Sequence, residues 1–169
     1  MGIESIPSES ACYPAKIAHG HIMWLIDRGV DFIFYPSLFY ERKQVRGSDN
    51  HYNCPIVTSY SENIRNNVEE ISSGQVRFRN PFMAFTSLNT VTEALIREFR
   101  DIPAGESTDA AAAGWKELYQ VRQDIRQEGE RILQYMEDKH VKGIVLAGRP
   151  YHIDPEINQG IPEMINSYG

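Results

Sequence analysis

The chain has 169 residues, enough for one domain that buries its own core without disulfide bonds. Its formal net charge of −6 argues against a general nucleic-acid role, which normally needs a basic surface. Two cysteines, no signal-peptide pattern and no apolar run as long as a membrane span predict a cytoplasmic protein with neither membrane nor nucleic acid as a partner.

Cys12 stands immediately before the first predicted helix, after a polar lead-in at 3–11 that reads as a loop. Pro14 is favoured in the first turn of a helix, so we expect a helix that begins near Tyr13 and runs toward Arg28. A helix N-terminus favours the thiolate, which is the form of cysteine that binds metals and attacks electrophiles. A buried structural cysteine is the alternative, because free cysteine is among the most often buried residue types.

Short apolar runs alternate with helical patterns as far as Phe99. We expect strands at 30–35 and 54–58, an extended segment at 75–85, helices at 61–71 and 89–99, and a long polar loop at 41–53. The expected N-caps are Ser59 or Ser61 for the first of these helices and Asn89 or Thr90 for the second. The alternation predicts a mainly parallel, three-layer α/β sheet, with residues 1–169 forming a single domain.

The longest helical pattern covers 107–139. Apolar residues recur at helical spacing, and charged residues occupy most of the other positions, which is typical of an amphipathic helix with a solvated face. Gly114 and Gly129 either break this helix or allow a close approach. A last helix is expected near the end of the chain, with Pro162 in its first turn.

Val141–Ala147 is predicted to be a buried strand, and a turn rich in functional groups follows it directly. Ligands of open α/β sheets bind beyond the carboxyl ends of strands. Arg149 can clamp a phosphate or carboxylate, Tyr151 adds a phenol, and His152 with Asp154 can transfer protons. The alternative is a turn whose polar side chains satisfy local backbone groups.

Cys12 and Cys54 each precede a proline and a predicted element, so we expect them to emerge at the same kind of sheet edge. Two thiolates are too few for a closed zinc site or an iron–sulfur cluster. Ligation by His19, His21 or His51 follows no standard spacing, and such histidines are more often exposed or hydrogen-bonded in a core.

Three segments together resemble the large acyl-CoA dehydratase activase-related proteins. They are Pro-Ser-Glu-Ser-Ala-Cys-Tyr-Pro-Ala-Lys at 7–16, Asn-Cys-Pro-Ile-Val-Thr-Ser-Tyr at 53–60 and Gly-Arg-Pro-Tyr-His-Ile-Asp-Pro-Glu-Ile-Asn at 148–158. Those proteins join ATPase modules, similar to the activator of 2-hydroxyglutaryl-CoA dehydratase, to a region that resembles the dehydratase subunits. The chain is similar to the latter region along essentially its whole length and contains none of the ATPase motifs.

The resemblance implies a flavodoxin-like α/β fold and a [4Fe–4S] cluster that passes one electron to a thioester substrate after ATP-driven reduction. It implies Cys12 and Cys54 as two cluster ligands. A third cysteine is missing. We expect it beyond Gly169, this chain being an excised part of a longer protein; the alternative is a family member that holds no complete cluster. The chain alone is then expected to be inactive, with an absent or incomplete cluster. The full-length protein would be an ATP-dependent activase, a reductase or a dehydratase-like enzyme.

The expected partners are the other domains of the full-length protein, including the ATPase modules, and acyl-CoA. From a different functional class, the alternative is a non-catalytic α/β module for binding or assembly. Its Arg149–Asp154 turn would hold a CoA-like group, a nucleotide or a neighbouring domain.

Overall fold

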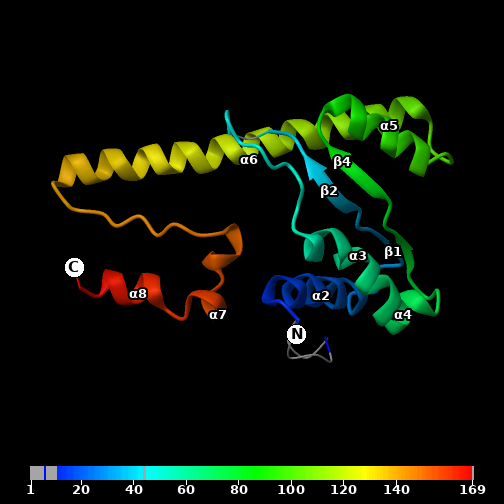
Figure 1. The fold of residues 1–169 in the computed structure, drawn as a ribbon, viewed down its shortest axis with the longest axis horizontal. Coiled ribbons are helices and arrows are strands. Elements are labelled where there is room, and N and C mark those ends of the chain that lie inside the picture. The colour runs from blue at the N-terminus through cyan, green and yellow to red at the C-terminus, as the bar shows by residue number, and fades with distance from the viewer. Residues whose placement is uncertain (1–5, 7–10, 44, 169) are drawn as a thin grey trace. The chain divides into compact units, whose positions relative to one another are not determined.

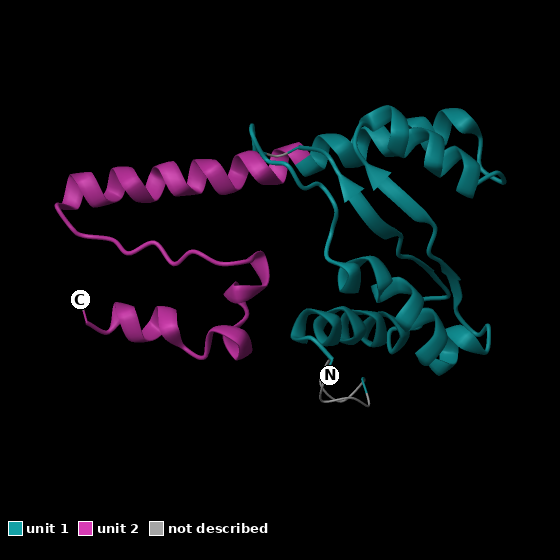
Figure 2. Ribbon diagram, viewed as in Figure 1, with its two compact units in different colours: residues 1–118 teal, residues 119–169 magenta. Residues whose placement is uncertain are grey.

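A computed structural model describes residues 6, 11–43 and 45–168. The chain divides into two compact units, residues 1–118 and 119–169, which are described separately (Figure 2). Most of the predicted lead-in at 3–11 lies outside the described residues. Within the described ranges, no helix is both long enough and apolar enough to span a membrane.

The elements alternate between helix and strand in unit 1 and are helical in unit 2 (Figure 1). Unit 1 contains α2 (Tyr13–Ile26), β1 (Phe32–Phe34), β2 (Ser37–Glu41), α3 (Pro55–Asn67), α4 (Glu69–Ser72), β3 (Arg77–Arg79), β4 (Phe82–Phe85), α5 (Leu88–Glu98) and the first part of α6 (Ala104–Lys139). Unit 2 contains the rest of α6, the 3-10 helix η1 (Pro150–Ile153), α7 (Pro155–Asn158) and α8 (Ile161–Asn166).

The strands of unit 1 form two extended stretches that run parallel to each other. β1 pairs with β3, and β2 pairs with β4. The offset between partner residues is the same just before and just after the gap that separates the two pairs of strands. This register places Pro36 opposite Pro81, and because proline has no N–H for the ladder, the pairing divides into two short sheets. The Tyr35 N–H donates to the Arg79 carbonyl and the Ser37 N–H to the Pro81 carbonyl, both at 2.9 Å, so the stretches stay together across the break.

The two faces of these paired stretches are buried against different helices. Successive strand residues point to opposite faces, so Ile33 joins one core and its neighbour Phe34 the other. The second core joins Met83 of β4 to Val91 of α5 and Ala111 of α6. The first core lies among α2, α3, α4 and β1 and contains Ile22, Ile33, Ile64, Val68, Ile71 and Val76.

The α/β class and the parallel pairing are therefore confirmed. The three-layer, flavodoxin-like sheet is not confirmed, because the described residues form two sheets of two strands each.

The strand predicted at 54–58 is wrong, because this segment begins α3. Pro55 stands at the first helical position, where its fixed φ suits a helix, and Cys54 is the N-cap in place of Ser59 or Ser61. Ser61 is instead 1% exposed and shares a short hydrogen bond with Ser37 of β2. A short apolar, β-branched run does not distinguish a strand from a helix start by itself. β2 was not predicted from the sequence, and only its last residue, Glu41, falls in the loop expected at 41–53.

The remaining helix predictions are close to the structure. α2 and α8 are confirmed with Pro14 and Pro162 in their first turns. α5 is confirmed too, but its N-cap is Ser87, whose Oγ accepts from the Thr90 N–H at 3.2 Å. α6 begins three residues earlier than predicted and continues through Gly114 and Gly129.

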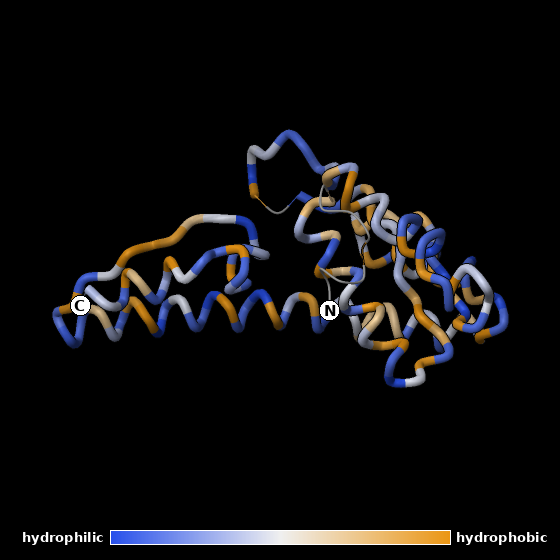
Figure 3. The backbone as a smooth tube through the Cα atoms, turned by 90° about the horizontal axis from the view of Figure 1, so that it is seen from below, coloured by the Kyte–Doolittle hydropathy of each residue, from blue (hydrophilic) through white to orange (hydrophobic). Residues whose placement is uncertain are grey.

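The buried strand predicted at Val141–Ala147 is wrong. The segment has no regular secondary structure, and Val145 is 90% exposed. Backbone groups from Lys142 to Gly148 make no hydrogen bond to any described residue. Figure 3 shows this apolar run in orange where it follows the long helix. A strand needs a neighbour to satisfy its backbone, and the described part of unit 2 contains no strand.

Candidate functional site

Cys12 and Cys54 occupy equivalent places at the starts of α2 and α3. Each is an N-cap residue with an extended backbone, φ −61° and ψ 144° for Cys12 and φ −53° and ψ 135° for Cys54, and a proline follows in each first turn. Neither side chain caps its helix through a bond to a described N–H. Both are free cysteines and exposed, so the alternative of a buried structural Cys12 is wrong.

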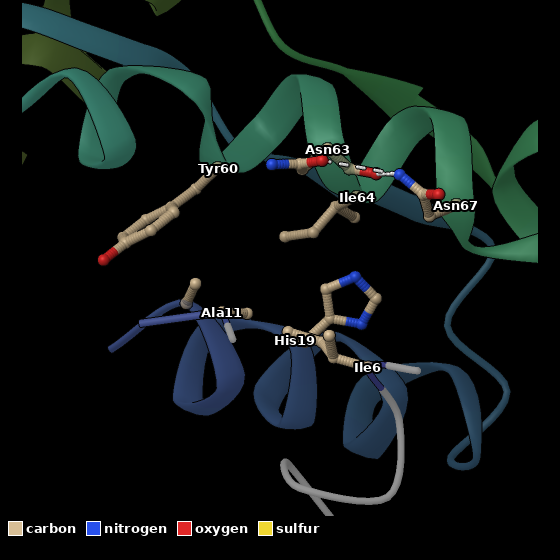
Figure 4. A pocket seen from close by; sticks show the side chains of 8 residues that line it. Ile6, Ala11, His19, Tyr60, Asn63, Ile64 and Asn67 are labelled. Carbon is tan, nitrogen blue, oxygen red and sulfur yellow. Dashed lines mark hydrogen bonds between the residues drawn. The ribbon is translucent and has the colours of Figure 1, made fainter. Parts of the chain in front are cut away.

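Two packing features bring these helix starts to the same end of unit 1. Figure 4 shows α2 and α3 side by side and running in the same direction, because the view passes from Ala11 to His19 along one and from Tyr60 to Asn67 along the other in the same sense. The chain before Cys54 is held against β2 by the Asn53 N–H, which donates to the Phe39 carbonyl at 3.0 Å. The predicted loop thus folds back along the strand and leads into α3.

Tyr60 contacts Cys12 across the two helices. Its hydroxyl lies 3.7 Å from the Cys12 Sγ. Burial raises the pKa of the Tyr60 phenol well above its usual range, and the thiols of Cys12 and Cys54 act in the same direction. Tyr60 therefore keeps its proton, and it can donate a hydrogen bond to the Cys12 sulfur.

A cavity of about 260 Å³ lies between α2 and α3, next to this group, and we call it the α2–α3 cavity. His19 contributes an imidazole that is only 6% exposed, and its Nδ1 has no hydrogen-bond partner among the described residues. The Tyr60 ring closes the cavity at the end near Ala11 (Figure 4). The eight lining residues are Ile6, Ala11, Ala15, His19, Tyr60, Asn63, Ile64 and Asn67.

Burial lowers the pKa of His19 below its ordinary value of 6.5, because the imidazolium would lose its hydration. The folded state then binds fewer protons than the unfolded state, so His19 makes the free energy of unfolding fall as the pH drops below 6.5. We expect His19→Gln to reduce this loss of stability, measured by urea unfolding at about pH 7.5 and pH 5.

His21→Gln is the matched control, because His21 is an exposed histidine on the same helix. Tyr60, the other titratable group of the cavity, titrates far above this pH range. Equal pH dependence in His19→Gln and the unsubstituted protein would contradict the expected role of His19.

The four predicted residues of the Arg149–Asp154 turn lie in unit 2. His152 Nδ1 accepts from the Arg149 N–H at 2.7 Å, and Asp154 caps α7 by accepting from the Glu156 N–H at 2.9 Å. The Tyr151 ring packs against that of His152, with 4.6 Å between the ring centroids. Arg149 and His152 also line an open cavity of about 660 Å³. His152 and Asp154 thus satisfy local backbone groups.

Across the residues that the structure describes, no cluster of three or more His, Cys, Asp or Glu side chains could hold a metal ion. His51 packs instead against the Tyr40 ring, with 5.6 Å between centroids. The positions of Tyr60 and His19 in the wall of the cavity were not predicted from the sequence. The helical spacing of Tyr60, Ile64 and Asn67 could have indicated that these three residues share a face of α3.

The chain was compared with known protein families, curated proteins and solved structures. A family model described as "CoA enzyme activase uncharacterised domain (DUF2229)" matches residues 1–169. A search of curated proteins and a search of solved structures found no match.

Proposed function

This chain belongs to the CoA enzyme activase domain family, and from that premise we propose that Cys12 and Cys54 are two ligands of a [4Fe–4S] cluster in the full-length protein. The match confirms the resemblance to acyl-CoA dehydratase activase-related proteins. The observation that carries the proposal is the placement of two exposed cysteines at equivalent N-cap positions of the neighbouring helices α2 and α3.

Cys12 and Cys54 would supply half of the ligands that a cluster usually has. Iron–sulfur clusters are held mainly by cysteine thiolates, usually four of them. This chain has two cysteines, and the helix N-terminus beside each one favours a negatively charged ligand. The other ligands would come from outside this chain. When bound, the cluster would supply low-potential one-electron transfer coupled to ATP hydrolysis in the ATPase modules, with acyl-CoA as the proposed substrate class.

Tyr60 would support the ligand set without binding the metal. Its protonated hydroxyl, 3.7 Å from the Cys12 Sγ, can donate to a ligating thiolate and orient it. Such outer contacts hold metal ligands in position and tune the metal that they bind.

Anaerobic reconstitution with iron and sulfide tests the proposal. The full-length protein should gain bound iron, sulfide and the visible absorbance of a cluster. This chain alone should gain little, because it supplies only two thiolates. Full-length protein that stays colourless and free of iron would contradict the proposal.

A second candidate function rests on the open cavity of unit 2. Its volume of about 660 Å³ and the guanidinium of Arg149 suit a CoA-like or nucleotide ligand with phosphate groups. A ligand that binds the folded state must raise the melting temperature, so thermal-shift measurements with acyl-CoA and nucleotides separate this candidate from the first. No shift at saturating ligand would count against it.

The proposal extends to the flavodoxin-like fold that the resemblance implies. Two observations support it: helices cover both faces of the paired strands, and Val141–Ala147 combines a strand-like composition with unpaired backbone groups. Such a segment is suited to join a sheet whose other strands lie elsewhere in the protein.

A further inference from the structure

We propose that the α2–α3 cavity binds a small uncharged ligand that joins an apolar body to one hydrogen-bonding group, of the amide or alcohol class, and that His19 Nδ1 bonds this group. The inference concerns a site separate from the sulfur atoms, and it does not depend on a cluster. Its failure would leave the proposed cysteine ligands untouched.

The size of the cavity requires more than one ordered water. Its volume of about 260 Å³ compares with about 30 Å³ for one water molecule in the liquid. A branched molecule with a few carbon atoms fits this space and would cover the apolar walls formed by Ile6, Ala15 and Ile64.

The residues that line the α2–α3 cavity favour an uncharged ligand. Among the lining residues that the structure describes, none is Asp, Glu, Lys or Arg. A charged ligand would lose hydration without gaining an ion pair, which is costly. The polar lining groups are an imidazole, a phenol and the amides of Asn63 and Asn67, all of which suit neutral hydrogen bonding.

His19 identifies where the polar group of the ligand binds. The residue is more than nine-tenths buried, and its Nδ1 has no partner among the described residues. Buried polar atoms are normally hydrogen-bonded, and leaving one without a partner destabilises the fold. A ligand amide or hydroxyl at Nδ1 would remove this cost, and the lowered pKa of His19 keeps the ring neutral for it.

NMR titration of the full 169-residue chain with isobutyramide tests the inference. Isobutyrate and isobutylamine at about pH 7.5 are matched probes of similar size and opposite charge. We expect isobutyramide to shift the His19 imidazole signals saturably and to leave the exposed His21 unchanged. The two charged probes should cause no saturable shift at His19.

Two variants locate the binding. His19→Phe, followed through the Ile64 methyl signals, should weaken isobutyramide binding about 3- to 10-fold, as expected for one neutral hydrogen bond. Ala15→Leu should fill the cavity and abolish binding, whereas Ala113→Leu, at an exposed position of α6, should not.

Three results would overturn the inference: no saturable shift with isobutyramide, equal binding of the charged probes, or unchanged binding in a folded Ala15→Leu variant. If Ala15→Leu does not fold, the comparison of isobutyramide, isobutyrate and isobutylamine in the unsubstituted chain still tests the inference.

Discussion

Replacing both Cys12 and Cys54 by alanine is expected to abolish cluster formation in the full-length protein. The double variant removes both proposed ligands from this chain, so the remaining ligands cannot hold the iron ions. Iron and sulfide content and visible absorbance after anaerobic reconstitution measure the loss. Each single variant should also lose most of its iron, because the two cysteines are proposed to hold the same cluster.

Tyr60→Phe tests the contribution of the Tyr60 hydroxyl separately from that of the cysteines. It removes the hydroxyl that lies 3.7 Å from the Cys12 Sγ but keeps the aromatic ring in the wall of the cavity. Loss of such an outer contact should weaken metal binding about 10- to 100-fold without abolishing it. An unchanged iron yield in the double cysteine variant would refute the ligand assignment, whatever Tyr60→Phe does.

Replacing Ile64 by alanine is expected to cost about 2–5 kcal/mol of unfolding free energy, which is the range for a buried isoleucine. Ile64 is 1% exposed and belongs to the first core, where α3 packs with α2 and α4. A loss of this size is a large part of the stability of an ordinary domain. Urea unfolding followed by circular dichroism measures it.

Ile56→Ala is the matched control, because it is the same substitution on the same helix at a residue that is 46% exposed. It should cost clearly less than Ile64→Ala, since less apolar surface returns to water. Equal losses for the two variants would contradict the position of Ile64 in the core between α2 and α3.

Local rules explain which elements the sequence predicted well. Helices α2, α5 and α6 follow from apolar periodicity. Pro14 located the start of α2 because proline lacks an N–H and its ring clashes with the preceding turn, so only the first turn of a helix tolerates it. The segment at 54–58 was misread because periodicity is undefined in so short a run. The proline rule that located α2 also applies to Pro55, and it would have corrected the error.

The α/β class, the long helix, the family and the two cysteines as candidate ligands could all be predicted from the sequence alone. These depend on local spacing, on proline geometry and on motifs that are continuous along the chain. Long-range packing set the contact of Cys12 with Tyr60, the burial of His19 in a cavity and the exposure of Val141–Ala147. Those outcomes depend on which distant segments pack together: a buried side chain and a strand each need a partner that no local pattern specifies.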